Sequence, residues 1–278
     1  MQLLESLFHY NFLQNAVLAA LLASIACGLT GAYVVSRRMV FLSGGISHAS
    51  FGGIGLAFFL GIHPPLGALV FGVASAMLIQ YLSDRQDVRN DSAIGILWSA
   101  GMALGIVFIY LTPGYVPNLM TYLFGNILTT SPADLWLLGL SAVLAVLAFI
   151  VFYPLVLAVA FDQGYARVRR LPAGAVNYLL MALVALTIVT SIRVTGIILV
   201  ISFLTLPQAI AAIFTRRLSG LMLWSVALSA AGSIGGILLS YTLNLPSGAV
   251  IIFTFALMFI LVRLTWWAIR AWARRAEN

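Results

Sequence analysis

Histidine and cysteine, the side chains that most often bind transition metals, are scarce in this chain of 278 residues, which has three His and one Cys. His48 follows Ser47 at the start of an apolar, glycine-rich run. A neutral imidazole is a good ligand for zinc, iron and related ions, and an ionisable group in an apolar run is costly. We therefore predict a metal-binding role for His48. The alternative is an imidazole that bonds a backbone carbonyl where two helices cross.

Several other kinds of chemistry are excluded. All 14 basic residues are Arg, which rules out a phosphate-binding P-loop and a Schiff-base lysine. Cys27 stands alone, so the chain forms no internal disulfide and no cysteine-rich zinc site. The metalloprotease motif HExxH is absent, and the adjacent Ser47 and His48 point to different faces of a helix. We predict that the chain is not an enzyme.

The elements that carry these residues are long and apolar. Hydrophobic residues make up 63% of the chain and charged residues 8%, whereas a soluble domain has about 25% charged residues. A membrane β-barrel would alternate apolar and polar residues, and these runs do not. The fold class predicted is all-α, a polytopic integral membrane helical bundle of eight or nine spans in a single domain, 1–278. The predicted spans are residues 12–35, 47–61, 66–82, 92–111, 134–157, 174–192, 195–213, 221–241 and 247–269.

Two stretches leave the topology open. Pro64 and Pro65 separate the short second and third runs, which are either two spans or the arms of one re-entrant hairpin. Residues 112–133 contain a stretch, 118–128, that is too short to span and is predicted to be a short outer or re-entrant helix.

The arginines predict the orientation. They cluster in alternate gaps between the runs, and only Arg193 falls in a gap of the other set. Because positive residues concentrate in cytoplasmic loops, nine spans place the N-terminus outside and the C-terminus in the cytoplasm. The arginines form no continuous stripe, so the net charge of +7 does not indicate nucleic acid. Membrane lipid is the partner that they indicate.

The longest polar gap, residues 161–172, lies on the predicted cytoplasmic face. We expect a short helix that starts after Asp162 and runs to about Arg170, with arginines beside an apolar stripe that includes Tyr165. This segment is either a solvated loop or a docking helix for a cytoplasmic subunit. In the second case Arg167 and Arg169 belong to the contact surface.

Six stretches, in order along the chain, resemble the permease subunit of bacterial ABC importers for zinc, manganese and iron. They are Arg37-Arg38-Met39 followed by Ser47-His48-Ala49, Asp91 to Ile96, Leu123 to Leu128, Phe161-Asp162 with Tyr165-Ala166, Leu206 to Ala209, and Leu245 to Gly248.

The resemblance implies a complex that works by alternating access. Its parts are a homodimer of permeases or a heterodimer, two cytoplasmic ATPase subunits that dock on residues 161–172, and an extracytoplasmic metal-binding protein. ATP and Mg would be bound by the ATPase partner, in the cell (inner) membrane complex, with no cofactor in this chain.

Gly44 departs from that pattern, since the family usually has Asp four residues before its histidine. Residues four apart share one face of a helix, so Asp and His together could grip a divalent ion. Without this carboxylate the case for manganese weakens, because manganese prefers oxygen ligands. The cargo is then zinc, iron or manganese, a metal chelate or an atypical metal, or another residue replaces the Asp.

Three further residues are candidates with two interpretations each. Asp91 is a helix N-cap or part of the substrate path, on which we also place Ser47 beside His48. Arg193 reaches to lipid headgroups or forms an outer gate. Met120 is a packing residue or part of that gate. A secondary transporter driven by an ion gradient is a rival reading, but such proteins carry acidic residues within spans, and here these residues lie outside the runs or at their ends.

Overall fold

The computed structural model describes residues 10–85, 88–113, 125–161 and 163–276. The elements are all helical: α2 (Asn11–Ser36), α3 (Phe41–Phe59), α4 (Pro64–Asp84), α5 (Asn90–Leu111), η1 (Ile127–Thr129), α7 (Pro132–Val151), α8 (Tyr153–Phe161), α9 (Gln163–Val168), α10 (Ala173–Thr195), α11 (Ile197–Phe203), α12 (Leu206–Phe214), α13 (Leu218–Leu243) and α14 (Ser247–Ala276). The predicted all-α fold is confirmed.

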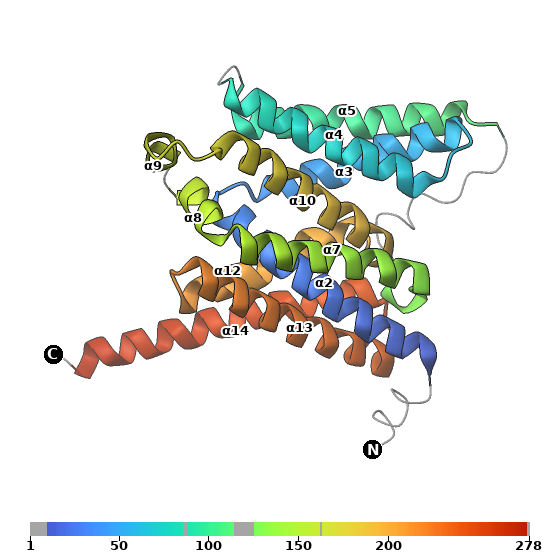
Figure 1. Ribbon diagram of the computed structural model, residues 1–278. Coiled ribbons are helices and arrows are strands. Elements are labelled where there is room, and N and C mark those ends of the chain that lie inside the picture. Colours follow the sequence, from blue (N-terminus) through green and yellow to red (C-terminus); the bar gives the residue numbers. More distant parts are fainter. Residues whose placement is uncertain (1–9, 86–87, 114–124, 162, 277–278) are drawn as a thin grey trace.

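Eight helical segments are long and apolar enough to cross a membrane, with α11 and α12 counted together. Helix α3 has 19 residues, about 28 Å at the usual rise, which is close to the thickness of the hydrocarbon core. It lies beside α4 and α5 in Figure 1. The lower predicted number of spans, eight, is therefore confirmed by the length and composition of the helices. Helix α3 is long enough to be a ninth span.

Most predicted spans differ from the helices of the structure by a few residues at their ends, and three of the differences have a structural reason. Helix α3 begins at Phe41, six residues before the predicted start at 47, because the small polar residues that lower its hydropathy pack well inside a bundle. The predicted run 134–157 breaks at Phe152, where α7 ends and α8 follows. The predicted run 195–213 breaks between α11 and α12.

The break between α11 and α12 has a clear cause. Pro207 occupies the first turn of α12, and a proline there cannot donate to the preceding turn and clashes with a continuing helix. Gln208 is fully buried, and its Nε2 donates to the carbonyls of Phe203 (3.0 Å) and Cys27 (3.1 Å). The side chain therefore satisfies a carbonyl that the break leaves free and links α12 to α2.

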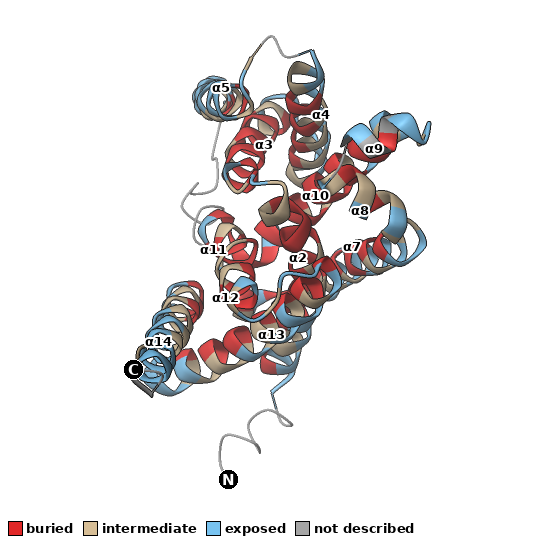
Figure 2. Ribbon diagram, turned by 90° about the vertical axis from the view of Figure 1, so that its left-hand side faces the viewer, coloured by how far each residue is buried: buried red, intermediate tan, exposed pale blue. Residues whose placement is uncertain are grey.

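The centre of the bundle is formed by α2 and α10. In each of these helices 67% of the most apolar stretch of 18 residues is buried, against 17% in α5 and in α14. Figure 2 shows the buried ribbon gathered on α2, α3 and α10 and the exposed ribbon on α5 and α14. The central helices thus carry the protein core, and α5 and α14 present broad apolar faces outward.

The helix ends have a defined arrangement. In Figure 1 the start of α2 lies at one end of the bundle, and α9 lies at the opposite end with the end of α14. Helix α14 has 30 residues, about 45 Å, which is longer than a span needs. Its last part extends beyond the bundle, where Trp267 and Trp272 are exposed and Arg270 lies 4.6 Å from the Trp266 ring.

Candidate functional site

Helix α3 carries His48 and packs unusually close to its neighbours. A Cβ added at Gly52 would lie 2.9 Å from the carbonyl oxygen of Gly101, and one added at Gly101 would lie 2.5 Å from the Cα of Ala49. Gly55 and Gly105 form a second close approach between the same two helices. These glycines let the α3 and α5 backbones touch, which brings the side chains at the same level together.

His48 lies near the middle of α3, about 10 Å along the axis from its first residue and about 16 Å from its last. Its Nδ1 is 3.3 Å from the Sδ of Met102 on α5. Its ring stacks on that of Trp98, with centroids 4.3 Å apart and planes 13° apart. All three side chains are partly buried. The structure therefore places the predicted ligand near the middle of α3, beside two residues that the sequence analysis did not select.

Gly44 lies against the indole ring of Trp98. A Cβ at this position would lie 2.7 Å from Cζ3 of the indole. The indole therefore fills the space that the side chain of an aspartate at position 44 would enter. In the described ranges no group of three or more His, Cys, Asp or Glu side chains is placed to hold a metal ion.

Ser47 and Asp91 are not part of this cluster. Ser47 is buried, and its hydroxyl has no hydrogen-bond partner among the described residues. Asp91 is exposed in the first turn of α5, 11 positions before Met102, about 16 Å along the axis. The N-cap of α5 is Arg89, so the interpretation of Asp91 as the cap is wrong. Its carboxylate instead complements the positive end of the helix dipole.

Arg193 forms an ion pair that sequence reasoning missed. Its Nε lies 2.6 Å from Oδ1 of Asp134. Asp134 belongs to a capping box at the start of α7, in which its carboxylate accepts from the Ser131 backbone (3.1 Å) and hydroxyl (2.6 Å). The only sequence signal was that an arginine outside the general pattern and an aspartate both lie at outer ends of runs. The interpretation as a gate stays a prediction.

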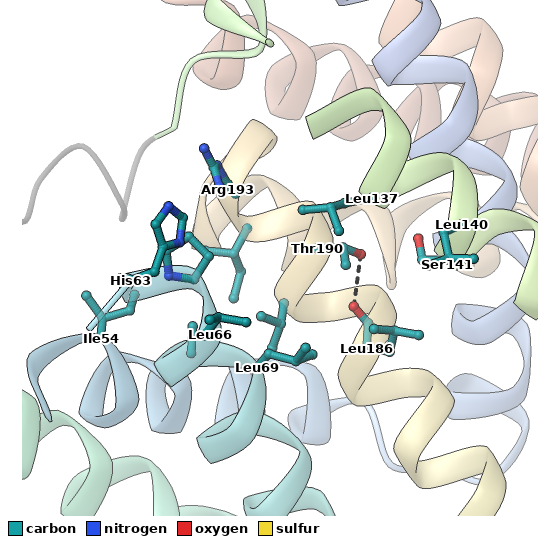
Figure 3. Close-up of a pocket in the computed structure, with 14 residues that line it drawn as sticks. Ile54, His63, Leu66, Leu69, Leu137, Leu140, Ser141, Leu186, Thr190 and Arg193 are labelled. Atoms are coloured by element: carbon teal, nitrogen blue, oxygen red, sulfur yellow. Dashed lines mark hydrogen bonds between the residues drawn. The ribbon is translucent and has the colours of Figure 1, made fainter. Parts of the chain in front are cut away.

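A largely apolar cavity of about 470 Å³ lies beside Arg193, between α4, α7 and α10. Figure 3 shows His63 and Arg193 near one end of it, while Leu66, Leu69 and Leu137 form its walls. The hydroxyl of Thr190 already donates its proton to the Leu186 carbonyl, at 2.9 Å. With an arginine beside its histidine and an apolar wall, this cavity is poorly suited to a metal ion.

The predicted coupling segment lies at the end of the bundle where α14 ends (Figure 1). Helix α9 ends at Val168, not at Arg170. Arg170 adopts the left-handed conformation (φ 52°), and the Leu171 amide donates to the Ala166 carbonyl at 2.9 Å, as in a Schellman motif. Asp162, like Met120, lies outside the described residues, and so do the side chains of Tyr165 and Arg167.

Two other features of this segment are described. Val168 is 84% exposed and Arg169 is exposed, whereas Ala166 is buried. Nη1 of Arg37, at the end of α2, donates to the Val159 carbonyl of α8 at 2.8 Å. The segment therefore presents an apolar and a basic residue outward, and the helix that precedes it, α8, is tied to α2.

The short helix predicted for residues 118–128 lies mostly outside the described residues. Its described end is the single turn η1. There the Leu128 amide donates to Oδ1 of Asn126 at 3.1 Å.

Comparisons with known proteins agree with this architecture. The ABC 3 transport family matches residues 9–265. An uncharacterized membrane protein of Synechocystis sp. is 41% identical over 91% of this chain and 90% of its own. The manganese import system permease protein ScaB of Streptococcus gordonii is 33% identical over 93% of each chain. The solved structure of PsaBC from Streptococcus pneumoniae, in complex with Fab, superposes with a TM-score of 0.83, at 31% identity and with 94% of both chains covered. The chain is thus a multi-pass membrane protein and belongs to the ABC 3 transport family.

Proposed function

We propose that the chain is the permease subunit of an ATP-driven importer that moves a divalent transition metal, zinc, manganese or iron, across the cell membrane by alternating access. Family membership supports the transport role, and the manganese import named for the S. gordonii relative supports the class of cargo. The position of His48 carries the proposal within this chain. It is an imidazole near the middle of a membrane-length helix, in contact with a thioether and only partly buried.

An imidazole at this depth is expensive unless it faces water, cargo or another protein surface. The cluster of His48, Trp98 and Met102 lies on the partly exposed side of the α3–α5 pair. We infer that a second permease copy covers this side, with the substrate path between the two copies. In a homodimer whose two copies meet at this face, neither His48 side chain is exposed to lipid.

ATP hydrolysis belongs to a partner subunit. The chain contains no lysine and therefore no P-loop, so ATP and Mg²⁺ bind to separate cytoplasmic ATPase subunits. Residues 161–172 are the docking segment, with Asp162, Tyr165, Arg167 and Arg169 at the contact. An extracytoplasmic metal-binding protein would deliver the cargo at the opposite end of the bundle. The positive charge at the α9 end of the bundle supports a cytoplasmic location for the docking segment.

The chain's own residues suggest how the site could work. His48 offers a neutral nitrogen to the passing ion, and the stacked indole of Trp98 limits the rotation of the imidazole. When ATP binding moves α9 as a rigid lever, α8 and α2 follow, because Arg37 links their ends. A shift of the packed helices by small steps then opens the site to one side at a time.

The test is co-purification of the chain with the ATPase subunit, followed by ATPase measurement with zinc, manganese and iron. We expect at least one of the three ions to stimulate hydrolysis when the delivery protein is present. A flat response to all three ions would contradict the metal claim. If uptake is faster with a chelate than with the free ion, the cargo is a metal chelate.

An ion-gradient-driven secondary transporter is the rival function. Among the described residues the acidic side chains lie near helix ends: Asp84 accepts from Gln80 at 2.7 Å, Asp91 is exposed and Asp134 pairs with Arg193. None is placed for ion coupling at mid-depth. Uptake by proteoliposomes that contain only this chain would favour the rival.

A further inference from the structure

We propose that His48 and Met102 form a nitrogen–sulfur transit site that favours zinc over manganese, with Trp98 in the place of a carboxylate. This inference rests on the proposed function and names the cargo that the same site prefers. It depends on three contacts: His48 to Met102, His48 to Trp98, and Trp98 to Gly44.

The two donor atoms already have the separation that one metal ion needs. Nδ1 of His48 and Sδ of Met102 lie 3.3 Å apart. Zinc binds nitrogen at about 2.0 Å and cysteine sulfur at about 2.3 Å, and its bond to a thioether is no shorter, so an ion bonded to both atoms would have a donor–metal–donor angle of about 100° or slightly less. That angle is close to tetrahedral. Zinc could therefore bridge the two side chains with little movement of either.

The donor types discriminate between the ions. Thioether sulfur suits soft and borderline ions, imidazole suits zinc, copper, iron and nickel, and manganese is best served by carboxylate, carbonyl and water oxygen. Among the described residues Asp91 is the carboxylate on the same helix, and it lies about 16 Å from Met102 along the axis. The pair therefore offers zinc two suitable donors and offers manganese none of the oxygen donors that it prefers.

Trp98 keeps a carboxylate at position 44 out of this set of donors. Its ring holds the imidazole by stacking and lies where a side chain at position 44 would begin. Gly44 and Trp98 are thus a matched pair, since an aspartate cannot be added at 44 while the indole stays. Two protein donors, completed by water or by the second copy, also hold an ion weakly enough to release it, which a transit site requires.

The first experiment compares zinc and manganese in the full-length chain reconstituted with its ATPase partner. Met102→Leu removes the sulfur and nearly keeps the side-chain volume. Met258→Leu changes a partly buried methionine of α14 and is the control. Because the loss of even an outer partner typically weakens metal binding by about tenfold or more, we expect Met102→Leu to weaken zinc binding at least as much. Manganese binding and the control should change little.

The second experiment rebuilds a carboxylate site. Gly44→Asp alone should disturb the fold locally, because its Cβ meets the indole. The double variant Gly44→Asp with Trp98→Ala makes room for the carboxylate and should shift the zinc-to-manganese ratio of binding toward manganese by about tenfold. X-ray absorption of the zinc-loaded wild-type protein should show one sulfur neighbour at a bonding distance no shorter than about 2.3 Å, and this signal should vanish in Met102→Leu.

The outcomes separate the two claims. Wild-type protein that binds manganese as tightly as zinc, or a zinc affinity that Met102→Leu leaves unchanged, would overturn the nitrogen–sulfur site while metal-stimulated ATPase activity still supports the importer. If no metal stimulates the ATPase yet zinc binds through Met102, the site stands and the proposed function fails.

Discussion

Arg193 and Asp134 are the residue pair whose partnership has the clearest consequence for stability. The Asp134 side chain is 9% exposed and that of Arg193 is 37% exposed. An ion pair with one partner this accessible is screened by water, so its own contribution is about 1 kcal/mol or less. Removal of the arginine costs more than that, because the carboxylate then stays buried with Ser131 as its remaining described partner.

A double-mutant cycle on the pair tests this. Arg193→Leu, Asp134→Asn and the double variant should show a coupling of about 0.5–1 kcal/mol in the free energy of unfolding, measured in detergent micelles. Arg216→Leu combined with Asp134→Asn is the control, since Arg216 is exposed in the turn between α12 and α13 and the two effects should be additive. Additive effects at Arg193 as well would show that the ion pair contributes nothing measurable.

At the scale of elements, the contact between α3 and α5 determines the site. Helix α5 is mostly exposed in the single chain, and it is held by glycines that let its backbone meet that of α3. Without this close approach Met102 and Trp98 would lie too far from His48 to touch it. The packing of two small-residue faces is therefore the structural basis of the cluster.

Two glycines of α5 provide a matched test. At Gly101 an added Cβ would lie 2.5 Å from the Cα of Ala49, whereas at Gly95 it would meet nothing within 4 Å. We expect Gly101→Ala to destabilise the protein by about 1–3 kcal/mol through overpacking. Gly95→Ala should be neutral or stabilising by up to about 1 kcal/mol. Thermal unfolding of both variants decides the matter, and equal melting temperatures would contradict the packing argument.

At the scale of the whole molecule, the bundle separates two ends with different tasks. The start of α2 and the turn between α3 and α4 lie at one end, and α9 and the end of α14 lie at the other (Figure 1). The arginine clusters fall at the second end, which we therefore predict to be the cytoplasmic end.

Thiol labelling from one side of the membrane tests this orientation. Cys27 is fully buried and should give little background. Ile62→Cys, in the exposed turn after α3, should react with an impermeant reagent added outside intact cells. Val168→Cys, at a position that is 84% exposed, should react only after the membrane is opened. The reverse pattern would invert the topology and remove the proposed docking role of α9.

Coupling to the ATPase is the second prediction at this scale. Tyr165→Ala with Arg167→Ala should leave the protein folded and the ATPase active but abolish metal uptake, because the lever no longer transmits the motion. Arg274→Ala, on the protruding end of α14, is the control and should keep uptake. The measurements are ATP hydrolysis and metal uptake in the same proteoliposomes, and normal uptake in the double variant would count against the coupling role.

Much of this molecule follows from the sequence alone. The long apolar runs predict the helices, since lipid requires every backbone group to pair within its own segment. The arginine pattern, the glycine-rich run and His48 are visible in the sequence, and the family resemblance shows that Gly44 stands where a carboxylate is usual. Helix boundaries were less secure, because a count of apolar residues registers neither the local steric effect of Pro207 nor the close packing of the small residues of α3.

Only the tertiary structure decided which side chains meet. Met102 and Trp98 stand on α5, about fifty positions from His48 along the chain, and no spacing rule connects them. The Arg193–Asp134 pair likewise joins two distant helix ends. Periodicity within a helix is local, whereas contact between helices depends on how closely their backbones approach. Here that approach is set by glycines, whose missing side chains leave few signs of which partner they face.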